Sequence, residues 1–155
     1  MSNEDIQLVA VGVSAISAIS AAISAFYSAR NSKTTLELYK LGRKEKLADD
    51  LDKILQIGLE YPYMENKSFT SQWDNFRGTD DEQYLRYDMY CNLIFNFLNR
   101  AFSHFEKDKS KVEEFIDVKS WVRVHKYNWI NPTDENENID AYDADFRAFI
   151  NSYIK

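Results

Sequence analysis

The sequence predicts an all-α protein in which a single N-terminal transmembrane helix precedes a bundle of about four helices. Three observations support this fold class. Residues 6–29 carry no charged side chain. Downstream of them, apolar residues recur at intervals of three and four, which is the period of a helix with one buried face. The 155 residues include only four Gly and two Pro, so few positions interrupt a helix.

The segment 6–29, IQLVAVGVSAISAISAAISAFYSA, is expected to cross a membrane, because about twenty apolar residues in a helix span the bilayer core. Its polar side chains are Gln7, several serines and Tyr27, and a serine hydroxyl in a helix can bond to a carbonyl one turn earlier. The chain opens with MSNED, which lacks the basic region of a cleavable secretory signal. The alternatives are a helix that lies on the membrane and a helix buried against a partner.

The serines of this segment share one face of the expected helix. At 100° per residue they oppose an apolar face that contains Ile16, Ile19, Ile23 and Phe26. Small residues let two helix backbones approach closely, so we expect self-association through the serine face, with a lone span as the alternative. The serine face comprises Ser14, Ser17, Ser20, Ser24 and Ser28.

Flanking charges predict the orientation of the span. Glu4 and Asp5 precede it, and six basic residues follow it within 30–46, beside two acidic ones. Because cytoplasmic flanks are enriched in Lys and Arg, we expect residues 1–5 to form a short extracytoplasmic tail. Residues 30–46 then form a basic juxtamembrane stalk and residues 47–155 a cytoplasmic helical domain. The six basic residues are Arg30, Lys33, Lys40, Arg43, Lys44 and Lys46.

The domain is acidic, because residues 49–155 carry thirteen basic and twenty-one acidic side chains. This charge argues against general nucleic-acid binding. Cys91 is the single cysteine, which excludes an intramolecular disulfide.

The first helix after the span is expected over residues 34–59, where Leu47, Leu51 and Ile54 mark a core-facing side. Pro62 ends this helix, because the residue before a proline avoids helical geometry. The loop from there to about residue 79 holds three large aromatic residues, too many for a solvated linker, so we expect it to pack across the domain. They are Phe69, Trp73 and Phe76.

A helix over about 81–105 is expected to be the central core element. Thr79-Asp80-Asp81-Glu82 is a helix-start signature, and a sustained apolar stripe follows it. A further helix is predicted over about 111–127, and a last one that begins after Asp140 or Asp143. The stripe comprises Tyr84, Tyr87, Tyr90, Cys91, Ile94, Phe97, Leu98, Ala101, Phe102 and Phe105.

One cationic face is the best small-ligand candidate. Lys119, Arg123 and Lys126 recur at helical spacing, and Trp129 lies close in the sequence, so charge and stacking together could hold a nucleotide or phosphate. The alternative is a solvated rim over a core aromatic cluster.

His104 and His125 show no metal-ligand spacing with each other or with Cys91. His125 lies on an apolar stripe, which is typical of a core imidazole bonded to a carbonyl or carboxylate. We therefore predict no catalytic residue, no metal and no cofactor. The sequence leaves open whether these three residues do more than fill the core.

Four segments resemble a group of small, uncharacterised bacterial proteins that have an N-terminal membrane helix and a helical cytoplasmic domain. These segments are EYPYMEN, YDMYCNLIFNFLNRAF, DVKSWVRVHKYNWINP and AYDADFRAFINSYI. The resemblance implies only an architecture and carries no reaction. Together with the uncharged span and its flanking charges, we expect a location at the bacterial inner membrane.

The function predicted from these features is a membrane-anchored binding or interaction module that contacts the bilayer, a second copy of itself and a protein partner. The alternative is a nucleotide-sensing membrane effector of the kind that acts in phage defence, which would use the cationic face. A third interpretation is an enzyme that uses His104 and His125.

Overall fold

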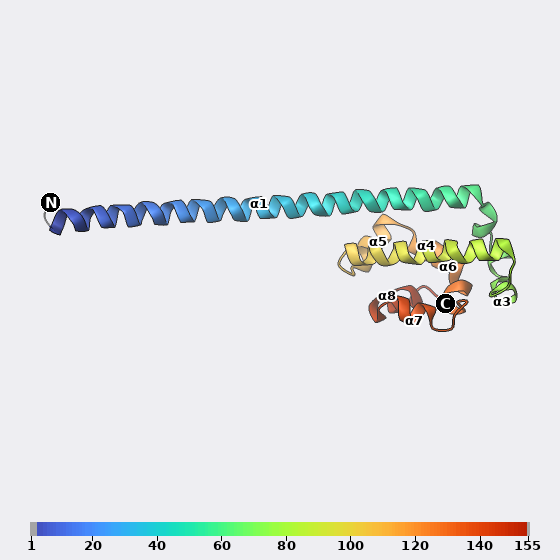
Figure 1. Ribbon diagram of the computed structural model, residues 1–155. Coiled ribbons are helices and arrows are strands. Elements are labelled where there is room, and N and C mark those ends of the chain that lie inside the picture. Colours follow the sequence, from blue (N-terminus) through green and yellow to red (C-terminus); the bar gives the residue numbers. More distant parts are fainter. Residues whose placement is uncertain (1–2, 155) are drawn as a thin grey trace. The chain divides into compact units, whose positions relative to one another are not determined.

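The computed structural model describes the backbone of residues 3–154 and the side chains of residues 23–154. This part of the chain is helical and contains no strand, which confirms the predicted fold class at the level of all-α. The chain divides into two compact units, Met1–Arg43 and Lys44–Lys155. The first helix, α1 (Asn3–Glu60), contributes to both units (Figure 1).

Within the described residues, no helix combines the length and the apolar character that a membrane crossing requires. Most of the predicted membrane segment 6–29 lies outside the residues whose side chains are described, and this includes Ser14, Ser17 and Ser20. Ser24 and Ser28 are described and are exposed.

The loop predicted after the first helix contains three short helices in the second unit. They are the 3-10 helix η1 (Pro62–Glu65), α2 (Lys67–Thr70) and α3 (Trp73–Phe76). The expected packing of this segment is confirmed, because Phe69 and Phe76 both stack on the Tyr84 ring. Their ring centroids lie 4.4 Å (Phe69) and 4.5 Å (Phe76) from that of Tyr84. Trp73 is buried and its indole N–H donates to the carbonyl of Asn131 at 2.6 Å.

The longest helix wholly inside the second unit is α4 (Glu82–His104), which is the predicted central element. Asp81 caps it by accepting hydrogen bonds from the backbone N–H groups of Gln83 and Tyr84. Gly78 precedes it at a φ of +71°, a conformation that side-chain-bearing residues rarely adopt. Its buried face is Tyr84, Tyr87, Tyr90, Cys91, Ile94, Phe95, Phe97, Leu98, Ala101 and Phe102.

The single helix predicted over 111–127 is two helices, α5 (Lys109–Phe115) and α6 (Val118–Ile130). The break occurs because Ile116 is extended and Asp117 starts a new helix, where its carboxylate accepts from the N–H of Ser120 at 3.1 Å. The first of these helices, α5, begins two residues before the predicted boundary and is capped by Asp108. Asp108 accepts hydrogen bonds from the backbone N–H groups of Ser110 and Lys111.

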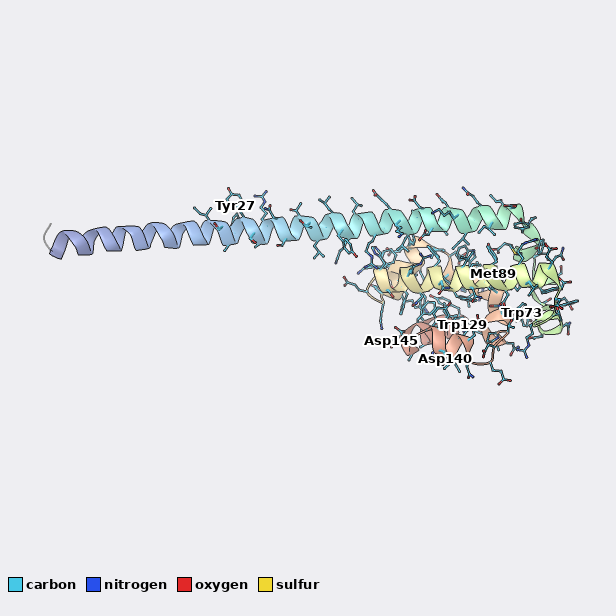
Figure 2. The ribbon with its side chains drawn as sticks, viewed as in Figure 1. Tyr27, Trp73, Met89, Trp129, Asp140 and Asp145 are labelled. Atoms are coloured by element: carbon cyan, nitrogen blue, oxygen red, sulfur yellow. The ribbon has the colours of Figure 1, made fainter. Side chains whose placement is uncertain are left out.

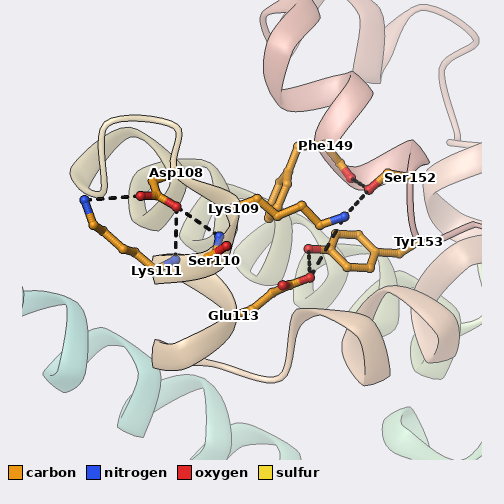
Figure 3. A network of polar contacts seen from close by, with 8 residues as sticks. All are labelled: Asp108, Lys109, Ser110, Lys111, Glu113, Phe149, Ser152 and Tyr153. Atoms are coloured by element: carbon orange, nitrogen blue, oxygen red, sulfur yellow. Dashed lines mark hydrogen bonds and ion pairs between the residues drawn. The ribbon is translucent and has the colours of Figure 1, made fainter.

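The last two helices are α7 (Glu137–Ala141) and α8 (Ala144–Asn151). Asp143, one of the two residues expected to precede the last helix, caps α8. Polar contacts connect α5 to the end of α8 (Figure 3). The Tyr153 hydroxyl donates to Glu113 at 2.8 Å, and Lys109 lies over the Tyr153 ring and donates to Ser152. These contacts hold the C-terminal segment against the rest of the unit.

Candidate functional site

A cluster of polar side chains lies in the aromatic core of the second unit, where η1, α4 and α6 meet. α6 contributes His125, α4 contributes Tyr87, Tyr90 and Cys91, and η1 contributes Glu65. Glu65 is the most accessible member, with 34% of its side chain exposed, whereas the His125 side chain has no exposed surface. The cluster therefore connects the core to the surface through one carboxylate.

His125 contacts a partner on each side of its ring. Nδ1 lies 3.2 Å from the Tyr87 hydroxyl and 3.8 Å from the Cys91 sulfur. Nε2 lies 3.4 Å from Glu65 Oε1, yet it makes no well-aligned hydrogen bond within the described part of the chain. The tautomer that carries its proton on Nε2 suits both sides, because Tyr87 then donates to Nδ1 and the ring N–H faces the carboxylate.

Glu65 is held in its ionised form. Burial alone raises the pKa of this carboxyl, but the neighbouring His125 and the Tyr90 hydroxyl outweigh that effect, so the pKa of Glu65 lies below its usual value. Tyr90 donates to Oε1 at 2.7 Å. Burial and this carboxylate together raise the pKa of Tyr90, which therefore remains a hydrogen-bond donor.

Gly58 of α1 leaves room for the Tyr90 hydroxyl. A Cβ atom at this position would lie 2.9 Å from that oxygen, closer than carbon side chains approach in proteins. The absence of a side chain therefore lets Tyr90 reach Glu65 beneath the helix.

Glu65 and Tyr90 line a groove beside the distal part of α1, with a volume of about 530 Å³. The other lining residues are apolar, apart from the Gly58 backbone, and Leu59 is 81% exposed at its edge. They are Leu55, Gly58, Leu59, Pro62 and Trp121. The volume of the groove and the residues that line it match those of small-molecule binding sites, which are mostly apolar and carry a few polar groups in fixed positions.

The cluster does not resemble a nucleophilic site. Cys91 has no exposed surface, and burial raises the pKa of its thiol well above the ordinary value, so the thiolate is disfavoured. Burial likewise raises the pKa of Tyr87. Tyr87 and Cys91 instead contact Nδ1 of His125, whose Nε2 faces Glu65.

The two histidines are not brought together. His125 contacts Cys91, whereas His104 lies thirteen residues further along α4, which is about 20 Å of helix. His104 instead meets Phe105 edge-on. The interpretation of a site that uses both imidazoles is therefore wrong for this fold. In the described part of the chain, no group of three His, Cys, Asp or Glu side chains is arranged to hold a metal ion.

The predicted cationic face is only partly assembled. Lys119 and Arg123 are exposed on α6, and Lys126 is half-buried with its ammonium 5.3 Å from the Tyr127 ring centroid. Trp129, in contrast, is 5% exposed and its indole N–H donates to Asn151 at 2.8 Å (Figure 2). Its ring packs against Phe95, Tyr142 and Phe146, so Trp129 is a core residue and does not present an open face for stacking.

A second hollow, of about 900 Å³, follows one flank of α1 in the first unit and includes Ser24 and Ser28. All of its lining residues belong to one helix, so it is an open helix surface and lacks the opposing walls of a binding site. Leu85, Met89 and Leu93 form a short exposed apolar stripe along α4. Met89 is labelled in Figure 2.

Sequence reasoning missed Glu65 and treated Tyr87 and Tyr90 as ordinary core residues. Twenty-five positions separate Glu65 from Tyr90, so no local spacing links them. The available signal was the proline: Pro62 starts a 3-10 turn that carries Met64 into the core and leaves Glu65 at its end.

Comparison with known protein families, curated proteins and solved structures finds no match for this chain.

Proposed function

We propose that this protein is a membrane-tethered helical binding module whose ligand site is the groove at Glu65. The observation that carries the proposal is the groove itself, which is mostly apolar and has one ionised carboxylate at its wall, held by a hydrogen bond from Tyr90. Binding sites commonly place a few rigid polar groups on an apolar lining in this way. The buried thiol and the neutral tyrosines beside it favour binding over catalysis.

The tether in this proposal is the uncharged segment 6–29, which crosses the bacterial inner membrane once. Residues 30–46 form a basic stalk that favours the anionic cytoplasmic surface, and the acidic helical domain of residues 47–155 faces the cytoplasm. The serine face of the span, Ser14 to Ser28, supports self-association in the bilayer.

Membrane fractionation tests the tether. Full-length protein is expected in the membrane pellet and to resist extraction by alkaline carbonate, and its recovery in the supernatant after high-speed sedimentation would contradict the proposal. Crosslinking in membranes tests self-association by comparing wild type with the Ser17→Leu/Ser24→Leu variant. The variant should lose the dimer band, because leucines keep the backbones apart.

The groove is tested by adding a small neutral aromatic probe, phenethyl alcohol, to full-length protein. Trp121 lines the groove, whereas Trp73 is 1% exposed and its indole is bonded to Asn131. In ¹H–¹⁵N spectra of the tryptophan indoles, the probe should move the Trp121 signal and leave that of Trp73 in place. A Trp121→Phe variant assigns the signal.

A further inference from the structure

We infer that the groove selects a small organic cation, an amine with an apolar body, whose positive charge pairs with the free oxygen of Glu65. This inference rests on the proposed role of the groove as a binding site and goes beyond it by naming the class of ligand.

The contacts of Glu65 leave one oxygen available. Tyr90 donates to Oε1 at 2.7 Å, and His125 Nε2 faces the same oxygen at 3.4 Å. Oε2 has no hydrogen bond from any described residue, and among those residues no Lys or Arg forms an ion pair with this carboxylate. A carboxylate ordinarily accepts several hydrogen bonds, so Oε2 can accept one from a bound molecule.

Charge and burial define what would complete the site. Two-thirds of the Glu65 side chain is removed from solvent, where a bare carboxylate is costly. The His125 and Tyr90 contacts, which lower the pKa of Glu65, keep it charged rather than protonated. An ammonium group can donate to Oε2 and neutralise this charge, whereas an anionic ligand would be repelled by it.

The remaining walls define the body of the ligand. Leu55, Leu59 and Pro62 offer aliphatic surface and Trp121 offers an aromatic ring, so an aryl or branched alkyl group is the matching partner. A volume of about 530 Å³ admits a molecule of small-metabolite size.

The test compares two probes of the same shape, phenethylammonium and phenethyl alcohol, on full-length protein by titrating the Trp121 indole signal. The ammonium compound should bind about tenfold more tightly or better, because a charge-assisted hydrogen bond is roughly twice as strong as a neutral one. In Glu65→Gln, which keeps the side-chain shape, the two probes should bind equally. Glu114→Gln, which alters an exposed carboxylate on α5, should keep the wild-type preference.

The outcomes separate this inference from the proposed function. Binding of the neutral probe to Glu65→Gln shows that the groove has kept its shape, so a lost preference is then due to charge. Equal affinity of both probes for the wild type, or a preference that persists in Glu65→Gln, overturns the inference and leaves the groove as a binding site. Failure of both probes to move the Trp121 signal counts against the proposed function itself.

Discussion

Replacement of Gly58 by alanine should have opposite effects on stability depending on whether residue 90 carries a hydroxyl. The added Cβ atom would lie 2.9 Å from the Tyr90 oxygen, and the next nearest atoms belong to Glu65, at 3.7 and 3.8 Å. At 2.9 Å the Tyr90 side chain or the helix backbone has to move, whereas 3.7 and 3.8 Å are ordinary van der Waals distances. The clash therefore falls on the hydroxyl alone, which is also the group that donates to Glu65 at 2.7 Å.

The magnitude follows from two opposing contributions. Displacing Tyr90 removes a hydrogen bond to a charged acceptor, which costs about 1.5–3 kcal/mol. Alanine in place of glycine inside a helix contributes about 1 kcal/mol in the other direction. Gly58→Ala should thus lower the free energy of unfolding by about 0.5–2 kcal/mol in the wild type. In a Tyr90→Phe background it should raise this free energy by up to about 1 kcal/mol.

Chemical denaturation of the four proteins in this double-mutant cycle, followed by circular dichroism, measures the coupling. Gly42→Ala is the matched control, because it lies in the same helix and its Cβ atom would have no neighbour within 4 Å. It should not destabilise either background. If Gly58→Ala destabilises the two backgrounds equally, the clash with the hydroxyl is not the cause and the account of the groove wall is wrong.

Three further outcomes are expected. The pKa of Glu65 is lower in the folded protein than in the unfolded chain, so its ionised carboxylate contributes to the free energy of unfolding above about pH 4.3. This contribution is lost as the pH falls through the folded-state pKa. Glu65→Gln should therefore reduce the decline in the free energy of unfolding that an acid titration measures. Asp81→Ala should cost about 1 kcal/mol in denaturant unfolding by removing the cap of α4, whereas Asp80→Ala, an exposed neighbour, should cost much less. Tyr153→Phe should keep its ring contacts but lose the bond to Glu113, with a decrease of about 0.5–1.5 kcal/mol in the free energy of unfolding; an unchanged stability would mean that the contacts in Figure 3 contribute little.

The helices that the sequence predicted well are those whose signals are local. The cap of α4, Asp81, lies within the predicted helix-start signature, and Asp143 is one of the two residues expected to precede α8. Such signals are local, because a cap acts on backbone N–H groups two or three residues away. Residue spacing also predicted most of the buried face of α4, but Phe95 is buried as well and Phe105 is only half-buried. The break at Ile116 was missed, because the apolar period continues through it and only the extended backbone there and the Asp117 cap divide α5 from α6.

The sequence by itself determined the helical fold class, the acidic charge of the domain and the burial of His125, since composition and period are enough for each. Only the tertiary structure decided what surrounds that imidazole. Packing of η1, α4 and α6 brings Glu65 beside Tyr90 and His125, which are 25 and 60 positions away in the chain. Packing also covers Trp129 in the core while Trp121, on the same helix, lines the groove. Such a site depends on contacts between distant segments, and these leave no spacing pattern in a single sequence.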